Sequence, residues 1–175
     1  PTAALVSNYD KMRMFRNVAV FDWGGGTLDV SILHIESGRV EEITTDGMNM
    51  AGDNIDKKIA EEIHKKYCLK KGISKSFDEV DGKSRDRLLV KSEAAKIALS
   101  EGDEIASVLV PNYDNAGVFR DSVEYELFEK LVQPEVDEAI NCLNRAIKKA
   151  RLNEANIDAI LCVGGSSRLK PFREK

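Results

Sequence analysis

The 175-residue sequence contains few cysteines, no long apolar run and no excess of positive charge, and each absence excludes a class of protein. Its three cysteines, Cys68, Cys142 and Cys162, are odd in number and far apart, which indicates a chain kept reduced in the cytoplasm. No apolar stretch is long enough to span a bilayer, and no signal peptide is present. The net charge of −4 and the pI near 5.4 argue against nucleic acid or an anionic membrane surface as a partner.

Histidine is also scarce, which bears on metal binding. Only His34 and His64 are present, one in an expected strand and one in an expected helix. Each fits a packing or surface position better than a ligand role, so we expect no His–Cys metal site. Because the chain starts at Pro1 without an initiator Met and ends as a helix begins, we expect a piece of a longer protein.

What the sequence does contain is 42% hydrophobic and 32% charged residues, as in an ordinary globular domain. Apolar runs near the amino terminus predict strands over Val18–Asp22, Leu28–Ile35 and Val40–Thr45. The turns between them are Gly24–Gly26 and Glu36–Arg39, and short turns between sequential strands indicate an antiparallel meander.

Helical periodicity dominates the remainder. Ile55, Ile59, Ile63 and Tyr67 recur every four residues on one face of an expected helix. Pro134 is expected to kink or break the longest helix and to open its second segment. The segment Thr2–Lys11 begins with a short helix-forming run and continues with polar residues. Further predicted elements are a helix from a cap at Asp53 or Asn54 to Gly72, a polar loop over Glu79–Asp86, a helix over Arg87–Ser100, a strand over Glu104–Val110, a hairpin loop over Pro111–Gly117 that leads into a short partner strand, the long helix over Ser122–Ala150, a buried strand over Ala159–Val163 and a new helix after Gly164–Arg168.

The stretch "DWGGGT", Asp22 to Thr27, joins two strands through three glycines. Consecutive glycines there indicate unusual backbone dihedrals or close approach of a ligand, and their N–H groups can hold a phosphate. Thr27 adds a hydroxyl donor, and Asp22 and Asp29 make sense beside a hydrated Mg²⁺. A Walker loop and a dinucleotide fingerprint both fit the spacing badly. A tight glycine hairpin without any ligand remains the alternative.

Two further stretches are compatible with a nucleoside. In "CVGGSSR" the glycines allow close approach of a flat ligand, Ser166 can cap the helix that follows, and Arg168 can stack on a purine ring. In "KSEAAKIALS", Glu93, Lys96 and Ser100 share one helix face, where they can hydrogen-bond a ribose and a purine edge. A solvated arginine after a helix cap and an ordinary exposed ion pair are the alternatives.

Taken together and in order, the stretches "PTAAL", "VFDWGGGTLDVSIL", "AGDNIDKKI", "EAAKIALS" and "VGGSSRLKPF" resemble the ATPase domain of heat-shock protein 70 (DnaK-type) chaperones. The resemblance implies an α/β fold of the actin-like ATPase (ribonuclease H-like) superfamily, of which this chain covers only the second lobe. It implies a larger subdomain over residues 1–51 and 134–175 and a smaller inserted α+β subdomain over residues 52–133.

The resemblance also assigns roles to individual residues. It implies that Asp22 reaches Mg²⁺ through water, with Asp29 behind it, and that Gly52 lies near the nucleotide. The implied contacts to the β- and γ-phosphates of ATP or ADP are Gly24, Gly25, Gly26 and Thr27. The implied contacts to adenosine are Glu93, Lys96, Ser100, Gly164, Gly165, Ser166 and Arg168.

Some features depart from the family pattern. Trp23, Ala51 and Ile97 stand where other residue types are usual, which suggests a diverged member. The family's first phosphate loop, its catalytic lysine and the glutamate before "PTAA" are not in this sequence. Since phosphoryl transfer needs charges on both sides of the γ-phosphate, we expect no complete catalytic set and no ATP hydrolysis by this piece alone.

The resemblance implies partners as well. In the parent protein these are nucleotide-exchange factors, J-domain co-chaperones and client polypeptides, with residues 52–120 as the exchange-factor surface. Two alternatives stay open: a diverged interaction module for exchange factors with little ATPase activity, and a lobe of another actin-like ATPase such as a sugar kinase.

Overall fold

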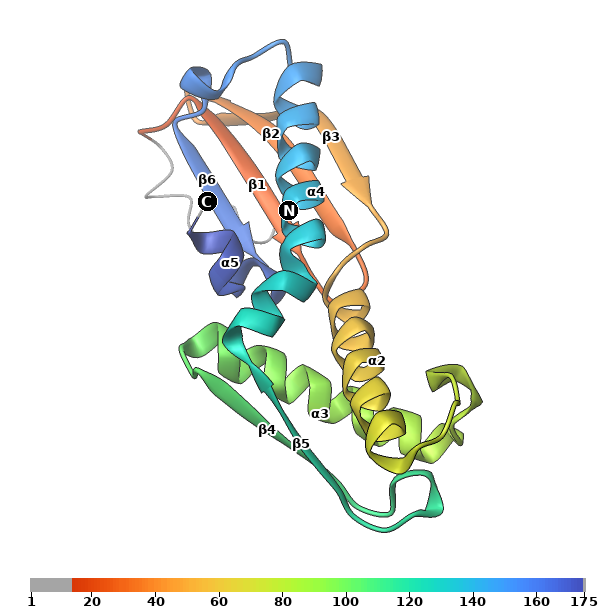
Figure 1. Ribbon diagram of the computed structural model, residues 1–175. Coiled ribbons are helices and arrows are strands. Elements are labelled where there is room, and N and C mark those ends of the chain that lie inside the picture. The colour runs from red at the N-terminus through yellow and green to blue at the C-terminus, as the bar shows by residue number, and fades with distance from the viewer. Residues whose placement is uncertain (1–13, 175) are drawn as a thin grey trace. The chain divides into compact units, whose positions relative to one another are not determined.

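The computed structural model describes residues 14–174, shown in Figure 1. The segment Thr2–Lys11, predicted to begin with a short helix-forming run, lies outside them. The chain divides into two compact units, which are described separately below. Within residues 14–174, the first takes in the residues up to Gly52 together with Pro134–Arg168, and the second takes in Asp53–Gln133 and the residues from Leu169 on.

The first unit contains a four-stranded sheet in the order β3-β2-β1-β6. Its strands are β1 (Asn17–Trp23), β2 (Leu28–Glu36), β3 (Arg39–Met48) and β6 (Ala159–Val163). β1 pairs antiparallel with β2, and β2 pairs antiparallel with β3, so the predicted meander is confirmed. β6 joins β1 in parallel, which aligns the carboxyl ends of these two strands at one edge.

Burial explains the strand order. Val18, Ala19, Val20 and Phe21 of β1 are all fully buried, as expected for a central strand covered on both faces. β3 is mostly exposed and polar, which suits an edge strand. The part of helix α4 (Tyr125–Lys149) that follows Pro134 crosses one face of the sheet in Figure 1, where Arg145 bonds Asp46 of β3 at 3.1 Å.

The second unit combines helices with a two-stranded sheet. Its helices are α2 (Gly52–Lys71), α3 (Gly82–Glu101), the first part of α4 and α5 (Lys170–Arg173), and its strands are β4 (Ile105–Val110) and β5 (Phe119–Glu124). The predicted apolar stripe of α2 is confirmed, because Ile55, Ile59, Ile63 and Tyr67 are all buried. The mixed α/β class is therefore confirmed as well.

Two helix starts differ from the prediction. α3 begins at Gly82, so most of the loop predicted over Glu79–Asp86 is wrong. The reason is a cap, since Asp81 Oδ1 accepts a hydrogen bond from Ser84 N at 3.1 Å. α4 begins at Tyr125 because the three preceding residues pair with β4 as part of β5.

A kink or a break was expected at Pro134, and the break is wrong. α4 runs through Pro134 as one helix of 25 residues, although the proline has no N–H for the i−4 carbonyl. Its apolar stripe continues on both sides of the proline, with Val132 and Val136 both buried.

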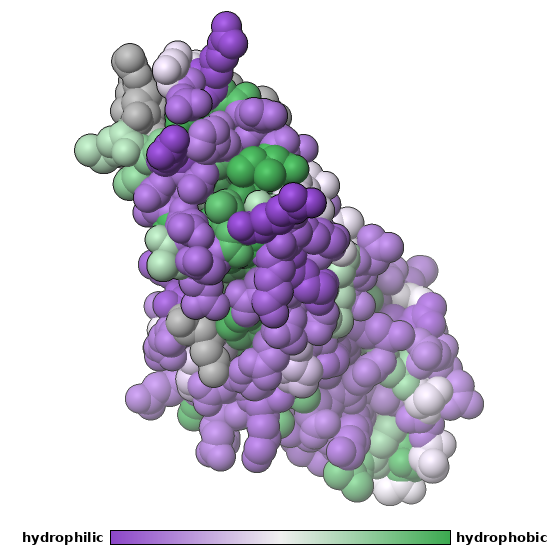
Figure 2. All heavy atoms as spheres, turned by 90° about the horizontal axis from the view of Figure 1, so that it is seen from above, coloured by the Kyte–Doolittle hydropathy of each residue, from purple (hydrophilic) through white to green (hydrophobic). Residues whose placement is uncertain are grey.

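Hydrophilic residues make up most of the face seen in Figure 2. Within residues 14–174, none of the helices combines the length and the apolar character needed to cross a membrane.

Candidate functional site

The glycine loop Gly24–Thr27 connects β1 to β2 and is closed by its own backbone. Gly24 N donates to Thr27 O at 3.0 Å. Gly25, Gly26 and Thr27 are exposed. Gly24 and Gly26 do not adopt the left-handed backbone conformation, and a Cβ on Gly26 would have no protein atom within 4 Å. Backbone strain and crowding by the chain itself therefore do not account for these two glycines.

The carbonyl of Gly24 is the point where three parts of the chain meet. It accepts one hydrogen bond from Gly52 N at 3.1 Å and another from Ser166 Oγ at 2.7 Å. Gly52 is the first residue of α2, so this carbonyl satisfies one of the unpaired N–H groups of that helix. A carbonyl oxygen has two lone pairs, and both have a donor here. Gly24, Gly52 and Ser166, which were predicted separately, are thus brought together.

The bonded role of Ser166 corrects one prediction. Ser166 was expected to cap a helix, but its hydroxyl donates to Gly24, and the residues that follow form a single 3-10 turn over Ser166–Arg168 before α5. Ser167 Oγ instead donates to Gly164 O at 2.8 Å. Arg168 lies at the end of this turn with an exposed side chain.

Gly164 is held against the end of β1. Its φ is +85°, and an added Cβ would lie 2.2 Å from Trp23 O and 3.0 Å from Gly24 N. No side chain can occupy that space, so glycine is required there by both conformation and contact. Trp23 itself is fully buried, with its ring edge-on to Phe21 at 6.0 Å between centroids.

Two aspartates lie beside the glycine loop. Asp22 and Asp29 are directly opposite each other in the β1–β2 register, so their side chains share one face of the sheet. Thr27 Oγ1 donates to Asp29 Oδ2 at 3.0 Å, which uses the hydroxyl hydrogen that was expected to face a phosphate. Like charges directly opposite each other destabilise a sheet, and a nearby cation would compensate.

Gly47 is a residue of this site that the sequence analysis missed. It pairs with Asp29 from the neighbouring strand β3. A Cβ at Gly47 would come within 3.1 Å of Asp29 Oδ1 and 3.0 Å of Leu28 O. The sequence could have indicated Gly47, because a single glycine inside a strand pattern is typical of close approach by another group.

The predicted helix contacts belong to the second unit. Glu93, Lys96 and Ser100 all lie on α3, with Glu93 exposed, Lys96 buried and Ser100 half-buried. Lys96 Nζ donates to Asp56 Oδ2 of α2 at 2.8 Å, and Ser100 Oγ donates to Lys96 O at 2.8 Å. Burial raises the pKa of Asp56, against the opposing effect of Lys96.

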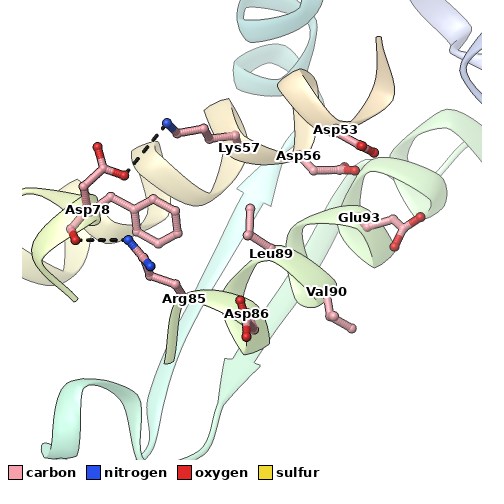
Figure 3. Close-up of a pocket in the computed structure, with 10 residues that line it drawn as sticks. Asp53, Asp56, Lys57, Asp78, Arg85, Asp86, Leu89, Val90 and Glu93 are labelled. Carbon is pink, nitrogen blue, oxygen red and sulfur yellow. Dashed lines mark hydrogen bonds and ion pairs between the residues drawn. The ribbon is translucent and has the colours of Figure 1, made fainter. Parts of the chain in front are cut away.

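A cavity of about 470 Å³ lies between α2 and α3 of this unit. Figure 3 shows Asp53, Asp56 and Glu93 grouped toward one end, with Lys57 and Arg85 toward the other. Arg85 Nη1 donates to the carbonyl of Asp78 at 3.1 Å, and Lys57 Nζ is 3.9 Å from the Asp78 carboxylate. Carboxylates outnumber cations on its walls.

Of the residues that depart from the family pattern, Ala51 is fully buried beside Gly52, and Ile97 is 48% exposed on α3. Among residues 14–174 no three His, Cys, Asp or Glu side chains converge as a metal cage.

Comparison with known proteins identifies the family of this chain. The sequence model of the Hsp70 protein family matches residues 1–175. A protein called chaperone protein dnaK, from Gracilaria tenuistipitata var. liui, is 33% identical over 181 residues. That alignment covers 99% of this chain and 28% of the relative, so the chain spans a little over a quarter of the relative's length.

Proposed function

Because this chain belongs to the Hsp70 family, we propose that it is the nucleotide-binding second lobe of a DnaK-like, ATP-dependent chaperone. The proposed ligand is ATP or ADP with Mg²⁺, and the proposed location is the cytoplasm. The proposed architecture is the actin-like ATPase fold, with a larger subdomain over residues 1–51 and 134–175 and a smaller inserted one over residues 52–133.

The observation that carries this proposal is the double hydrogen bond to the Gly24 carbonyl. A trans peptide is planar, and its C=O and N–H point in opposite directions. Since Gly52 and Ser166 hold the Gly24 carbonyl on one side, the N–H of Gly25 must point to the other side. Gly25 is exposed, and in this proposal its N–H is the donor to a phosphate oxygen.

The open space at Gly26 supports the same conclusion. A methyl group would fit there without touching the protein, so the fold does not explain the glycine. A ligand that approaches the backbone closely does explain it. Gly24–Thr27 would hold the β- and γ-phosphates in this proposal.

Asp22 and Asp29 suit a hydrated magnesium ion. Mg²⁺ usually keeps several waters and is held by one or two carboxylates together with substrate phosphates, rather than by a cage of protein ligands. Two carboxylates on one sheet face, beside an exposed glycine loop, match that pattern. Asp22 would contact the ion through water, and Asp29 would orient Thr27.

The proposed adenosine contacts fall into two groups of residues. Gly164, Gly165, Ser166 and Arg168 follow β6, whose carboxyl end lies beside that of β1, and ligands of open α/β sheets bind outside such ends. Arg168 would stack on the purine. Glu93, Lys96 and Ser100 would contact the ribose and base from α3.

We propose that this piece does not hydrolyse ATP alone. Positioned charges on both sides of the γ-phosphate are needed for phosphoryl transfer, and the family's other lobe supplies half of them. In the whole protein, exchange factors, J-domain co-chaperones and client polypeptides would be the partners.

Calorimetric titration of Mg·ADP into the protein tests this proposal. Gly26→Ala should abolish or strongly weaken binding without loss of fold, while Gly82→Ala, also in open space, should leave binding unchanged. Arg168→Ala should weaken binding more than Arg39→Ala, the matched loss of an exposed arginine. Binding that is equal in all four variants would place the nucleotide elsewhere. Absence of binding to the unmodified protein would refute a preformed pocket in this piece.

The second candidate function is a docking module for exchange factors. The β4 strand supports it, because Ile105 and Leu109 are 57% and 41% exposed on its outer face. Retained exchange-factor binding by variants that have lost Mg·ADP binding would favour this candidate.

A further inference from the structure

His64 and Cys68 are one turn apart on α2 and lie on the same helix face. The sulfur Sγ of Cys68 is 3.3 Å from His64 Nε2. The carbonyl oxygen of Lys75 is 2.9 Å from the same nitrogen and 3.4 Å from the same sulfur. Both side chains are buried, at 3% and 8% exposure. One nitrogen, one sulfur and one oxygen atom, each able to bind a metal ion, therefore form a small triangle.

The distances between these three atoms suit a cation with tetrahedral coordination. With a metal–sulfur bond of about 2.3 Å and metal–nitrogen and metal–oxygen bonds of about 2.0–2.2 Å, tetrahedral ligands lie roughly 3.4–3.6 Å apart. The three observed separations run from 2.9 to 3.4 Å. Each edge needs to lengthen by no more than about half an ångström to take the ion.

The second ring nitrogen of His64 is also held as in metal sites. Nδ1 lies 2.8 Å from the hydroxyl of Tyr113, which is fully buried. A phenol can donate or accept, so it serves both tautomers of the imidazole. With the metal on Nε2, the Nδ1–H would donate to Tyr113, which is the usual support for a ligating histidine.

The triangle is reachable from outside. His64, Cys68 and Lys75 line a cavity of about 400 Å³, and Glu61 lies on its wall. Two of the triangle's three ligand atoms belong to side chains, and the third is the main-chain oxygen of Lys75. A cation bound there would differ from the expectation from sequence that no His–Cys metal site forms.

We propose that His64 Nε2, the Cys68 thiolate and the Lys75 carbonyl bind a borderline or soft divalent cation of the zinc type. Imidazole and thiolate together select such ions over Mg²⁺ or Ca²⁺. The fourth position faces the cavity and takes water. Binding forms a metal–sulfur bond and releases the thiol proton to solvent, leaving the imidazole neutral. The site lies within the second unit and does not depend on the proposed nucleotide function.

Titration with Cd²⁺ tests the site through the ultraviolet thiolate-to-cadmium charge-transfer band. The reference protein carries Cys162→Ser, because Cys162 is exposed and could bind the probe, whereas Cys142 is fully buried. One equivalent of Cd²⁺ should bind, with release of one proton. Adding Cys68→Ser should abolish the band, and adding His64→Gln should weaken binding at least tenfold. Glu61→Gln, on the same cavity wall, should leave affinity within twofold.

Circular dichroism in the presence of a chelator checks that each variant folds. A second measurement needs no further variant: one equivalent of Zn²⁺ should slow alkylation of Cys68 by iodoacetamide at least tenfold in the Cys162→Ser protein, read by mass spectrometry. Absence of the band and of this protection would overturn the proposal, as would a full one-equivalent band in the folded Cys68→Ser variant.

Discussion

Gly164 and Gly117 form a matched pair that separates backbone strain from steric clash. Both have φ of +85°. A Cβ at Gly164 would lie 2.2 Å from Trp23 O, whereas a Cβ at Gly117 would have no atom within 4 Å. Replacing each by alanine therefore imposes the same unfavourable φ, and only Gly164→Ala adds a collision with the backbone of β1.

The expected losses of folding stability follow from the backbone strain and the steric clash. A left-handed conformation costs a non-glycine residue about 1–2 kcal/mol. The reduced entropy of the unfolded chain offsets about 0.4–1 kcal/mol of this. Gly117→Ala should thus lose roughly 1 kcal/mol. Overpacking adds about 1–3 kcal/mol, so Gly164→Ala should lose about 2–4 kcal/mol.

Urea denaturation followed by far-ultraviolet circular dichroism measures both losses. The fluorescence of Trp23, the single tryptophan, reports separately on the first unit. Equal losses for the two variants would refute the reasoning, since they would mean that Gly164 does not contact the end of β1. Complete failure of Gly164→Ala to fold, beside a folded Gly117→Ala, would agree with it.

Three further outcomes are expected. Ser166→Ala should cost about 0.5–1.5 kcal/mol in urea denaturation, and no more, because Gly24 O keeps its bond from the α2 amide; a loss above 3 kcal/mol would contradict this. Main-chain N–H groups that donate to the carboxylate of Asp158 lower the pKa of this group from its usual value of 3.8. The stability that Asp158 contributes is therefore present above pH 3.8 and is lost as the pH falls through the lower pKa of the folded state. In the Asp158→Asn variant, the urea midpoint of unfolding should fall less between about pH 6 and pH 2 than in the unmodified protein. Lys96→Met should destabilise by about 3–5 kcal/mol by leaving Asp56 buried beside no cation, and adding Asp56→Leu should restore most of that loss in the same denaturation assay.

Local signals were enough for the regular elements. The strands β1 and β2 follow from apolar runs, and α2 follows from isoleucines spaced four apart, because burial imposes these patterns directly. The start of α3 was missed since Gly82–Asp86 is mostly polar and gives no periodic signal, although the Asp81 cap was present in the sequence. The start of α4 was missed because strand pairing with β4 overrides helix-compatible residues.

The sequence predicted the motifs of the candidate site but not the hydrogen bonds between them. Both glycine motifs can be recognised in the sequence, yet the hydroxyl of Ser166 donates to the carbonyl of Gly24, which is 142 positions away. From sequence, the serine before a helix favours a local cap. Likewise the His64–Cys68 spacing was visible, but the Lys75 carbonyl that completes the donor triangle depends on how the chain returns after α2. Contacts of this kind depend on tertiary packing, so no periodic pattern in the sequence predicts them.

The Gly24 carbonyl also explains why the two glycine motifs must be kept together. Gly164 brings the chain close enough to β1 for Ser166 to reach that carbonyl, and Ser166 in turn holds the peptide group that joins Gly24 to Gly25. A substitution in Gly164–Arg168 should therefore alter the backbone of Gly24–Thr27, although the two motifs are far apart in sequence. Residues that share partners in this way show non-additive substitution effects. The Ser166→Ala and Gly26→Ala variants should accordingly couple in Mg·ADP affinity, whereas Ser166→Ala and Arg39→Ala should combine additively.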